Sequence, residues 1–394
     1  MNAATFFKLA LACGILVAGI EIGWLLIAPL PYDVSGYMIG RDFVPTWVGA
    51  KAAVGGNPAQ YFGYEAFNAL LQSYFGPDYP PHNWSYPPHL LLFTWPLAFL
   101  PYMAAYVAYC ALGFALYLAV VSDGERRLDH LALLALAPAV TLNIWTGQNG
   151  FLTASLLIGG LTQLDRRPLL SGVLFGLLSI KPQLGFLLPL MLVLTGRWRV
   201  IAAAAVTIAA LAGLAGLVFG PRIWADYFEI AMAVQKRITT EWRGFSITNM
   251  PTAFMNLQLI GLPTRWSYGF QAIVSSATLA AVVWVFWRPR DPVLSLAFFV
   301  SATFLFTPYA FNYDMVAFGW VMLKLMDRPD NDVWDYALMV TVWVLPFATI
   351  LIGLAGIPGS FLPILSLTVR LAWRIRRAET YETTSQFVRP ALQP

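Results

Sequence analysis

The sequence is poor in charged residues. Asp, Glu, Lys and Arg make up 11% of its 394 residues, whereas about 25% is usual in soluble domains. Hydrophobic residues make up 59%, which is more apolar surface than one water-soluble core can hide. The composition therefore predicts an all-α integral membrane protein, in which residues 1–394 form a single domain without a soluble appendage.

Cysteine and histidine are scarce as well. Cys13 and Cys110 both lie inside apolar runs, so we expect no disulfide in the loops. Two of the three histidines belong to "YPPHNWSYPPH", residues 79–89, where the lack of a neighbouring cysteine leaves any zinc shell incomplete. The net charge of +4 does not provide the basic surface that nucleic acid requires. We expect no metal, no cofactor and no nucleic acid.

Long apolar runs recur along the whole chain. The first, Leu9 to Pro31, is too long for the core of a cleaved signal peptide, so it is expected to remain as a helix. The hydropathy pattern predicts about twelve transmembrane helices. They are expected near residues 6–30, 101–122, 131–146, 150–164, 168–180, 183–196, 200–219, 267–287, 293–307, 315–326, 336–355 and 359–373.

Arginine marks every second connection between these runs. By the positive-inside rule, the arginine-bearing connections, both termini and the tail 374–394 are expected in the cytoplasm. This pattern indicates a multi-pass protein of the cell (inner) membrane. The arginines concerned are Arg126, Arg127, Arg166, Arg167, Arg197, Arg199, Arg288, Arg290, Arg328, Arg374, Arg376 and Arg377.

Two connections on the opposite, extracytoplasmic side are long and rich in aromatic residues, 31–88 and 220–266. The first contains apolar residues at helical spacing, which predicts a helix lying flat on the outer membrane surface. The charges of the second read mainly as a solvated helical face, although Trp242 and Arg243 could meet a substrate. Whether this loop takes part in a site stays open. The residues at helical spacing are Phe67, Leu70, Leu71, Tyr74 and Phe75.

The stretch "SIKPQLG" places Lys181 inside a short apolar hairpin. The 14 steps from Arg167 to Lys181 (181 minus 167) correspond to about 21 Å of helix, whereas the hydrocarbon core is about 30 Å thick. Pro182 breaks the helix at this depth, which is tolerated only beside protein or a water-filled cavity. We therefore expect Lys181 on the floor of an outward-facing cavity, where it binds phosphate; the alternative is a snorkelling lysine.

The stretch "GRDFVPTW" supplies Arg41 and Asp42 at the start of the first outer loop. Asp42 could simply cap a helix beginning at Phe43, as aspartate often does. Pro45 weakens that interpretation, because it has no N–H to donate to the cap. A carboxylate is also the kind of group that removes a proton from a hydroxyl, so we predict that Asp42 is a catalytic base.

Two polar turns are further candidates for substrate binding. "WTGQNGF" offers Gln148 and Asn149, whose neutral amides can bind sugar hydroxyls without the desolvation cost of charges. "TPYAFNYD" offers Asn312 and Asp314 in a turn that is as well explained by an aromatic belt.

The repeated Tyr-Pro-Pro-His block and one acidic residue complete the candidates. Tyr86 and His89, which come just before the membrane, are expected at the cavity, while Tyr79 and His82 are expected on the surface. Glu21 lies inside the first span, where a carboxylate costs about 2.5–3.5 kcal/mol and so faces the bundle interior. It fits a structural partner as well as a catalytic role.

In order along the chain, these motifs resemble glycosyltransferase family 87. The likeness rests on "RDF", "YPPHLLLFTWPLAFLP", "GQNGFL", "GVLFGLLSIKPQLGFLLPL" followed by "GRWR", and "TPYAFNYD". It implies a type C glycosyltransferase bundle that takes a sugar from a polyprenyl phosphate, with mannose as the default, and an acidic base that matches Asp42. Some mannosyl-transferring members carry a histidine in the last motif, where this sequence has Tyr313 and Asp314.

We therefore predict a hexosyltransferase that moves a sugar from a polyprenyl-phosphate donor to the hydroxyl of a lipid or glycan acceptor on the outer side, with inversion. The alternative is a transporter or flippase of lipid-linked sugars, which needs polar groups reachable from both sides. A non-catalytic assembly protein is a third interpretation, in which Asp42 and Lys181 could be replaced freely. The sequence does not identify the sugar, the acceptor, the pathway or the oligomeric state.

Overall fold

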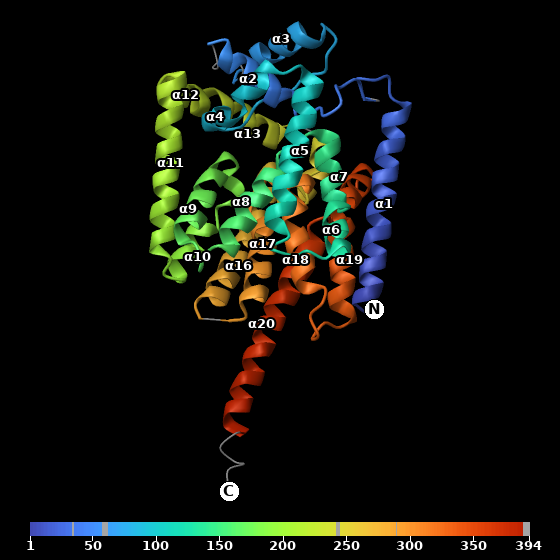
Figure 1. Cartoon of the computed structure of the whole chain (residues 1–394), viewed down its shortest axis with the longest axis vertical. Coiled ribbons are helices and arrows are strands. Elements are labelled where there is room, and N and C mark those ends of the chain that lie inside the picture. Colours follow the sequence, from blue (N-terminus) through green and yellow to red (C-terminus); the bar gives the residue numbers. More distant parts are fainter. Residues whose placement is uncertain (34, 57–61, 242–244, 289, 389–394) are drawn as a thin grey trace.

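The computed structural model describes residues 1–33, 35–56, 62–241, 245–288 and 290–388. Within these ranges the regular structure is helical, apart from one isolated antiparallel bridge between Tyr32 and Met38 (Figure 1). The prediction of an all-α protein is confirmed for the described part of the chain.

Five of the described helices are long and apolar enough to cross a membrane: α1 (Ala3–Ile27), α5 (Tyr102–Val121), α11 (Trp198–Phe219), α16 (Thr264–Phe286) and α19 (Val333–Leu354). A sixth span is possible if α6 (Leu128–Ala135) and α7 (Pro138–Thr146) count together, since they meet at a 50° bend. Pro138 explains the bend, because proline disfavours helical geometry in the residue before it. These helices support an integral membrane protein.

The remaining predicted spans are helical, but among the described residues none of these helices is both long and apolar enough to cross a membrane. The shorter apolar helices are Pro88–Phe99 (η2, α4 and η3), α8 (Gly150–Thr162), Pro168–Ile180 (α9 and η4), Pro182–Leu194 (η5 to α10) and α17 (Pro292–Phe306). They are followed by η7 (Asn312–Ala317), α18 (Phe318–Leu325) and α20 (Leu362–Val388). All twelve predicted segments contain helix, but by length and composition the described helices do not amount to twelve spans.

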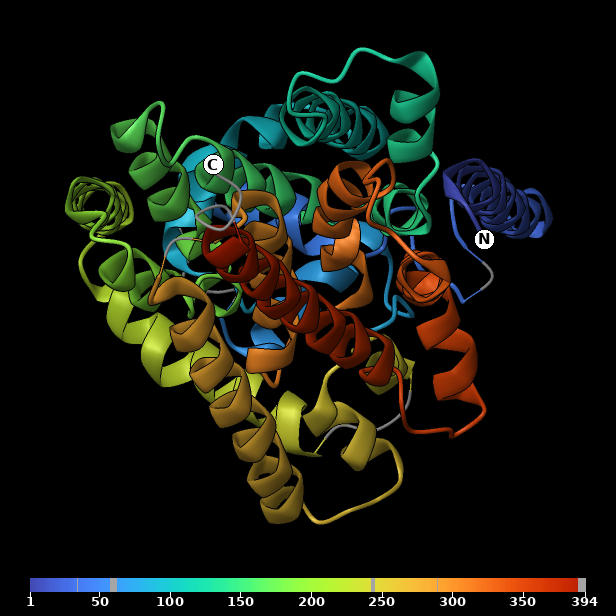
Figure 2. The ribbon, with the colours of Figure 1, turned by 90° about the horizontal axis from the view of Figure 1, so that it is seen from below.

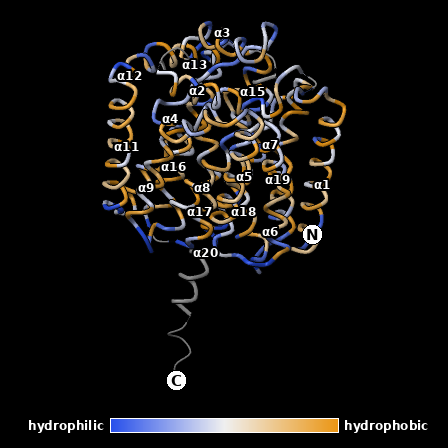
Figure 3. The backbone as a smooth tube through the Cα atoms, turned by 45° about the horizontal axis from the view of Figure 1, so that its top comes forward, coloured by the Kyte–Doolittle hydropathy of each residue, from blue (hydrophilic) through white to orange (hydrophobic). Residues whose placement is uncertain are grey.

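The bundle has two different ends. At one, which we call the loop end, lie α2 (Val44–Val54), α3 (Tyr64–Phe75), α12 (Arg222–Asp226) and α13 (Met232–Glu241), at the top of Figure 1. The N-terminus and the tail of α20 lie at the other, which we call the arginine end. Apolar segments form the shafts of the helices between the two ends (Figure 3).

Ion pairs join the connections at the arginine end. Arg127 lies 3.5 Å from Asp327, Arg328 lies 2.9 Å from Asp291, and Arg374 lies 2.6 Å from Asp330. These contacts bring together three arginine-bearing connections that are far apart in the sequence. These three connections and the start of the tail therefore lie together at the arginine end.

The helix expected in the first long loop is α3. It buries Phe67 and Leu71, which are four residues apart and so lie on one face of the helix. Tyr74 and Phe75 pack against the Trp47 ring of α2, with ring centroids 5.3 and 6.0 Å apart. The helix is therefore confirmed, but its apolar face is covered by protein rather than left for lipid.

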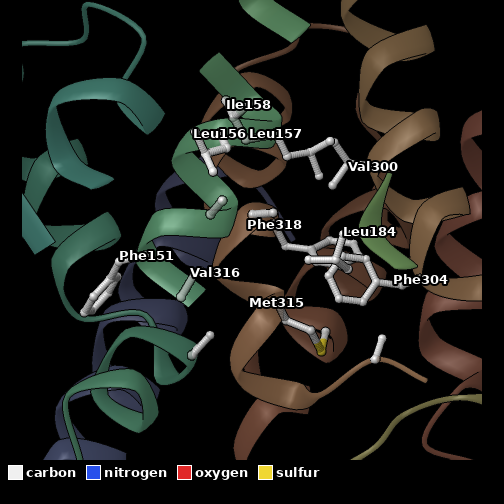
Figure 4. Close-up of a cluster of buried hydrophobic side chains, with 14 of the residues drawn as sticks. Phe151, Leu156, Leu157, Ile158, Leu184, Val300, Phe304, Met315, Val316 and Phe318 are labelled. Carbon is white, nitrogen blue, oxygen red and sulfur yellow. The ribbon is translucent and has the colours of Figure 1, made fainter. Parts of the chain in front are cut away.

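The centre of the bundle is α8, which is buried on almost every side. On one side of this helix lie Val300 and Phe304 of α17 and the residues 315–318 (Figure 4). On the other side, the Phe151 ring packs on Phe114 and Tyr117 of α5, with ring centroids 5.7 and 5.6 Å apart. Small residues allow such close packing: a Cβ on Gly160 would collide with the Phe175 ring. The turn before α8 carries Gln148 and Asn149, and η7 carries Asn312 and Asp314.

Figure 2, seen from the arginine end, shows α20 crossing the middle of the molecule while α1 and α11 stand at its periphery. The peripheral position of α1 becomes important for access to the site.

Candidate active site

A cavity of about 1120 Å³ lies at the loop end of the bundle. Both long loops, the broken hairpin around Lys181 and the turns near residues 148 and 310 contribute to its wall. Segments that are separate in the sequence therefore meet around one space. The predicted site residues that line it are Arg41, Asp42, Tyr86, Gln148, Lys181 and Asn312.

Lys181 interrupts the hairpin as expected. The 3-10 turn η4 (Leu178–Ile180) ends before it and η5 (Pro182–Leu184) begins after it, and its own backbone has φ −138° and ψ 70°. This non-helical geometry is what a following proline imposes. The side chain is only 3% exposed and reaches the cavity wall, so the snorkelling alternative does not describe it.

Asn149 and Asp314 hold the Lys181 ammonium group. Lys181 Nζ donates to Asn149 Oδ1 at 3.1 Å and to Asp314 Oδ1 at 2.6 Å, and it lies 4.5 Å from the centre of the Tyr313 ring. Neither Asn149 nor Asp314 lines the cavity. An ammonium group has three N–H donors, so one is left for a ligand in the cavity.

Asp42 lies where the first loop meets the turn between α7 and α8. Its backbone N–H donates to Thr146 O at 2.9 Å, and Gly147, with φ +71°, allows the contact because a Cβ there would meet Phe43. The N-cap of α2 is Phe43, which has no side-chain capping bond, so Asp42 does not act as the cap. No described residue makes a hydrogen bond or ion pair with the Asp42 carboxylate, which lines the cavity.

Arg41 is held beside Asp42 by the first loop. Its guanidinium lies 4.0 Å from the Asp33 carboxylate and 5.9 Å from the centre of the Tyr37 ring. Both partners also line the cavity. Arg41 is therefore a paired cation at the wall.

The histidines of the repeated block lie in different places from those expected. His82 lines the cavity, whereas His89 does not: its ring contacts Ser179 Oγ at 3.1 Å and stacks on Trp224. Tyr79 is buried, so the expected surface position is wrong; its ring packs on Phe75 at 4.8 Å. Partial burial lowers the pKa of His82 to about 4, so this ring is neutral near pH 7.

Asn143 is a key residue that the sequence motifs did not single out. It is fully buried, donates to Tyr313 O at 2.7 Å and accepts from Gly150 N at 2.9 Å. It thereby joins α7, α8 and η7 behind Lys181. Asn312 plays a similar part, because its amide donates to Pro346 O at 2.7 Å. An asparagine inside an apolar helical run is the only signal that could have pointed to Asn143.

Two further regions reach the cavity. Glu21 of α1 is 6% exposed and lines it, next to Trp24. Gln235, Lys236 and Thr239 of α13 line it as well, so the second long loop does contribute. Trp242 and Arg243 lie outside the described residues. No group of three or more His, Cys, Asp or Glu within the described ranges could hold a metal ion.

One cavity thus presents a carboxylate that has no partner among the described residues, a buried ammonium group and several amides and aromatic rings. A model of glycosyltransferase family 87 matches residues 84–308, more than half of the chain. The chain belongs to glycosyltransferase family 87. No curated protein and no solved structure matches it.

Membership of family 87 makes this protein a membrane glycosyltransferase, with a sugar donor and an acceptor. The matched range includes Tyr86, Gln148 and Lys181 but neither Asp42 nor Asp314. Asp42 and Asp314 are therefore assigned to the site by the geometry described above.

Proposed function

We propose that the protein transfers a hexose, with mannose as the default, from a polyprenyl-phosphate donor to an acceptor hydroxyl. The reaction takes place in the cavity at the loop end. The observation that carries the proposal is that the unpaired carboxylate of Asp42 and the ammonium group of Lys181 line the same cavity. One is suited to accept a proton and the other to bind a phosphate.

The donor phosphate binds at Lys181. Two of the three N–H donors of Lys181 are fixed by Asn149 and Asp314, and the third is directed to a phosphate oxygen. A point cation at this position stabilises the phosphate that leaves the sugar. Asp314 is a positioning residue, since it acts through Lys181. Gln148, Asn312 and Tyr86 of the wall bind sugar hydroxyls.

Asp42 is the base. It takes the proton of the acceptor hydroxyl while that oxygen attacks the anomeric carbon. The bond between the anomeric carbon and the phosphate oxygen breaks, and polyprenyl phosphate leaves with the electron pair. A single displacement inverts the anomeric centre. Since phosphate is already a good leaving group, no second carboxylic acid is needed, in contrast to glycosidases.

Asp42→Asn tests this assignment. Membranes are incubated with polyprenyl phosphates carrying radiolabelled mannose or another hexose and with candidate lipid and glycan acceptors. We expect the variant to lose at least about a hundredfold in transfer, the range of general base catalysis. Asp78→Asn, at an exposed acid of the same loop, is the matched control and should keep full activity. Unchanged transfer by Asp42→Asn would remove Asp42 as the base.

We further propose that the loop end faces the extracytoplasmic side of an inner membrane, with both termini in the cytoplasm. The arginine end supports this orientation through the positive-inside rule. In a variant without Cys13 and Cys110, a single cysteine at the exposed positions 78 or 166 can be labelled with a membrane-impermeant maleimide on intact cells. Labelling at 78 but not at 166 is expected, and the reverse result would invert the orientation.

A transporter or flippase of lipid-linked sugars is the alternative. It would need polar groups that are reachable in turn from both ends of the bundle. The cavity residues Asp42, Gln148 and Lys181 line one space together with residues of both long loops, which favours chemistry at the loop end. The radiolabel assay separates the two functions, because a transporter leaves the sugar on its carrier lipid.

A further inference from the structure

Two contacts join helices α1 and α19 in their halves nearer the arginine end. There the Phe6 and Tyr336 rings lie 6.1 Å apart, and Trp343 Nε1 donates to Ala10 O at 3.0 Å. Toward the loop end, α1 leans away from the bundle (Figure 1). Along this part both helices line the cavity: α1 through Glu21 and Trp24, and α19 through Phe347, Ile350, Leu351 and Leu354. The two helices therefore form a crevice that widens toward the loop end.

The wall of this crevice is apolar and open to its surroundings. Trp24, Leu351 and Leu354 are 44%, 51% and 62% exposed, although all three line the cavity. They belong to helices that are long and apolar enough to cross a membrane. Apolar side chains that are exposed at this depth meet lipid rather than water. The crevice is thus a lateral opening between the bilayer and the cavity.

A buried carboxyl group lies at the inner end of the crevice. Glu21 is 6% exposed, and its Oε1 has no hydrogen-bond partner among the described residues. Neither α1 nor α19 contributes a Lys or Arg to the lining. A carboxyl group without a cation binds a hydroxyl well and an anion poorly. Trp24 and Trp145, with ring centroids 6.1 Å apart, add flat apolar surface beside it.

The cations of the cavity belong to other elements. Arg41, whose guanidinium lies beside the Asp33 carboxylate, comes from the first long loop, Lys181 from the broken hairpin and Lys236 from α13. Phe186, which is 53% exposed, lines the cavity on the hairpin side. Asp42 is bonded through its backbone to Thr146, the neighbour of Trp145. The base Asp42 therefore lies on the same side of the cavity as Glu21. The phosphate-binding cation, Lys181, comes from a separate element.

We infer that the acceptor is a membrane-anchored glycolipid with an uncharged sugar head group, and that it enters between α1 and α19. Its hydrocarbon chain lies in the crevice against Leu351 and Leu354. Its head group lies at Trp24 and Trp145, with one hydroxyl bound to Glu21 and another directed to Asp42. The inference rests on the proposed function, because it assigns the acceptor of the same cavity. An anionic lipid is unsuited to this opening.

Photolabelling of the full chain in lipid nanodiscs tests the inference without requiring catalysis. Three probes carry the same diazirine-bearing alkyl chain: a neutral alkyl glucoside, an alkyl phosphate and the plain alcohol. Labelled peptides are located by mass spectrometry. We expect the glucoside to label α1 and α19 in preference to the other two probes, and excess unmodified alkyl glucoside to protect both helices.

Three variants sharpen the result. Leu351→Trp narrows the crevice and should reduce labelling by the glucoside at least about fivefold, whereas Leu16→Trp, at an exposed position of α1 outside the cavity, should not change it. Glu21→Leu should reduce the advantage of the glucoside over the alcohol up to about tenfold, the ratio for one hydrogen bond. Unfolding curves confirm that each variant is folded.

Two results would overturn the inference: stronger labelling of α1 and α19 by the phosphate than by the glucoside, or labelling that Leu351→Trp leaves unchanged. Either can occur while Asp42→Asn still abolishes transfer, in which case the proposed function stands and the acceptor route falls. Conversely, the expected labelling together with full transfer by Asp42→Asn would retain the crevice and remove the assigned base.

Discussion

The buried ion pair between Lys181 and Asp314 allows structure and function to be separated experimentally. The side chains are 3% and 0% exposed, and their charged atoms lie 2.6 Å apart. Asp314→Asn leaves Lys181 with Asn149 and the Tyr313 ring as its remaining partners. Lys181→Met leaves the Asp314 carboxylate, among the described residues, with the N–H of Phe311, at 3.3 Å. Each change strands a buried charge, so each should lower the free energy of unfolding by about 3–5 kcal/mol.

The double variant Lys181→Met/Asp314→Leu should be far more stable than the sum of the single changes implies. If the two effects were independent, the loss would be about 6–10 kcal/mol. Because no charge is left unpaired, we expect a loss of about 1–3 kcal/mol, chiefly from Asn149, whose Oδ1 loses its donor. Transfer should nevertheless fall about a hundredfold or more, since the phosphate contact is gone.

The measurement is a titration with sodium dodecyl sulfate in mixed micelles, followed by circular dichroism, together with the radiolabel assay. Asp129→Asn is the matched control, because Arg127 and Asp129 form a pair that is 58% and 45% exposed; it should cost at most about 1 kcal/mol. Single variants of the buried pair that behave like this control would refute the burial argument. A double variant with native activity would show that Lys181 does not bind the donor.

Two further predictions concern the outer loop and the centre of the bundle. The lowered pKa of His82, about 4 against 6.5, means that the unfolded chain binds a proton that the folded chain does not. Stability should therefore fall by about 2–3 kcal/mol as the pH is lowered from 6.5 to 4. His82→Gln should remove this fall, and acid titration of both proteins measures it. Gly150→Ala should cost about 2–4 kcal/mol in the same unfolding titration, because the added Cβ meets the Asn143 amide and Tyr313 O. Gly19→Ala is the control for Gly150→Ala, because no atom lies within 4 Å of the added Cβ, and it should not destabilise the protein. Equal losses of stability in these two variants would contradict the packing of α8.

Local features of the sequence were sufficient for the helices and for their order. Long apolar runs require intrahelical hydrogen bonds in lipid, whatever their neighbours are. Pro182 breaks the helix after Lys181 through its own ring, so the interruption at that residue could be predicted and is confirmed. The number of membrane-crossing helices could not be predicted in this way. A helix such as α8, which is surrounded by protein, does not have to match the thickness of the bilayer.

Contacts between distant segments decided the site. The two Tyr-Pro-Pro-His repeats are chemically identical, so no local rule could place His82 at the cavity and His89 against Trp224. Likewise, Lys181 and Asp314 are 133 residues apart, and only the packing of η7 on α8 brings them together. The sequence by itself determined which segments are helical, where they break and which ends carry arginine, because these depend on near neighbours and on the lipid. Only the tertiary structure decides which polar side chains share one cavity and that α1 and α19 separate toward the loop end. Both depend on how the helices pack against one another.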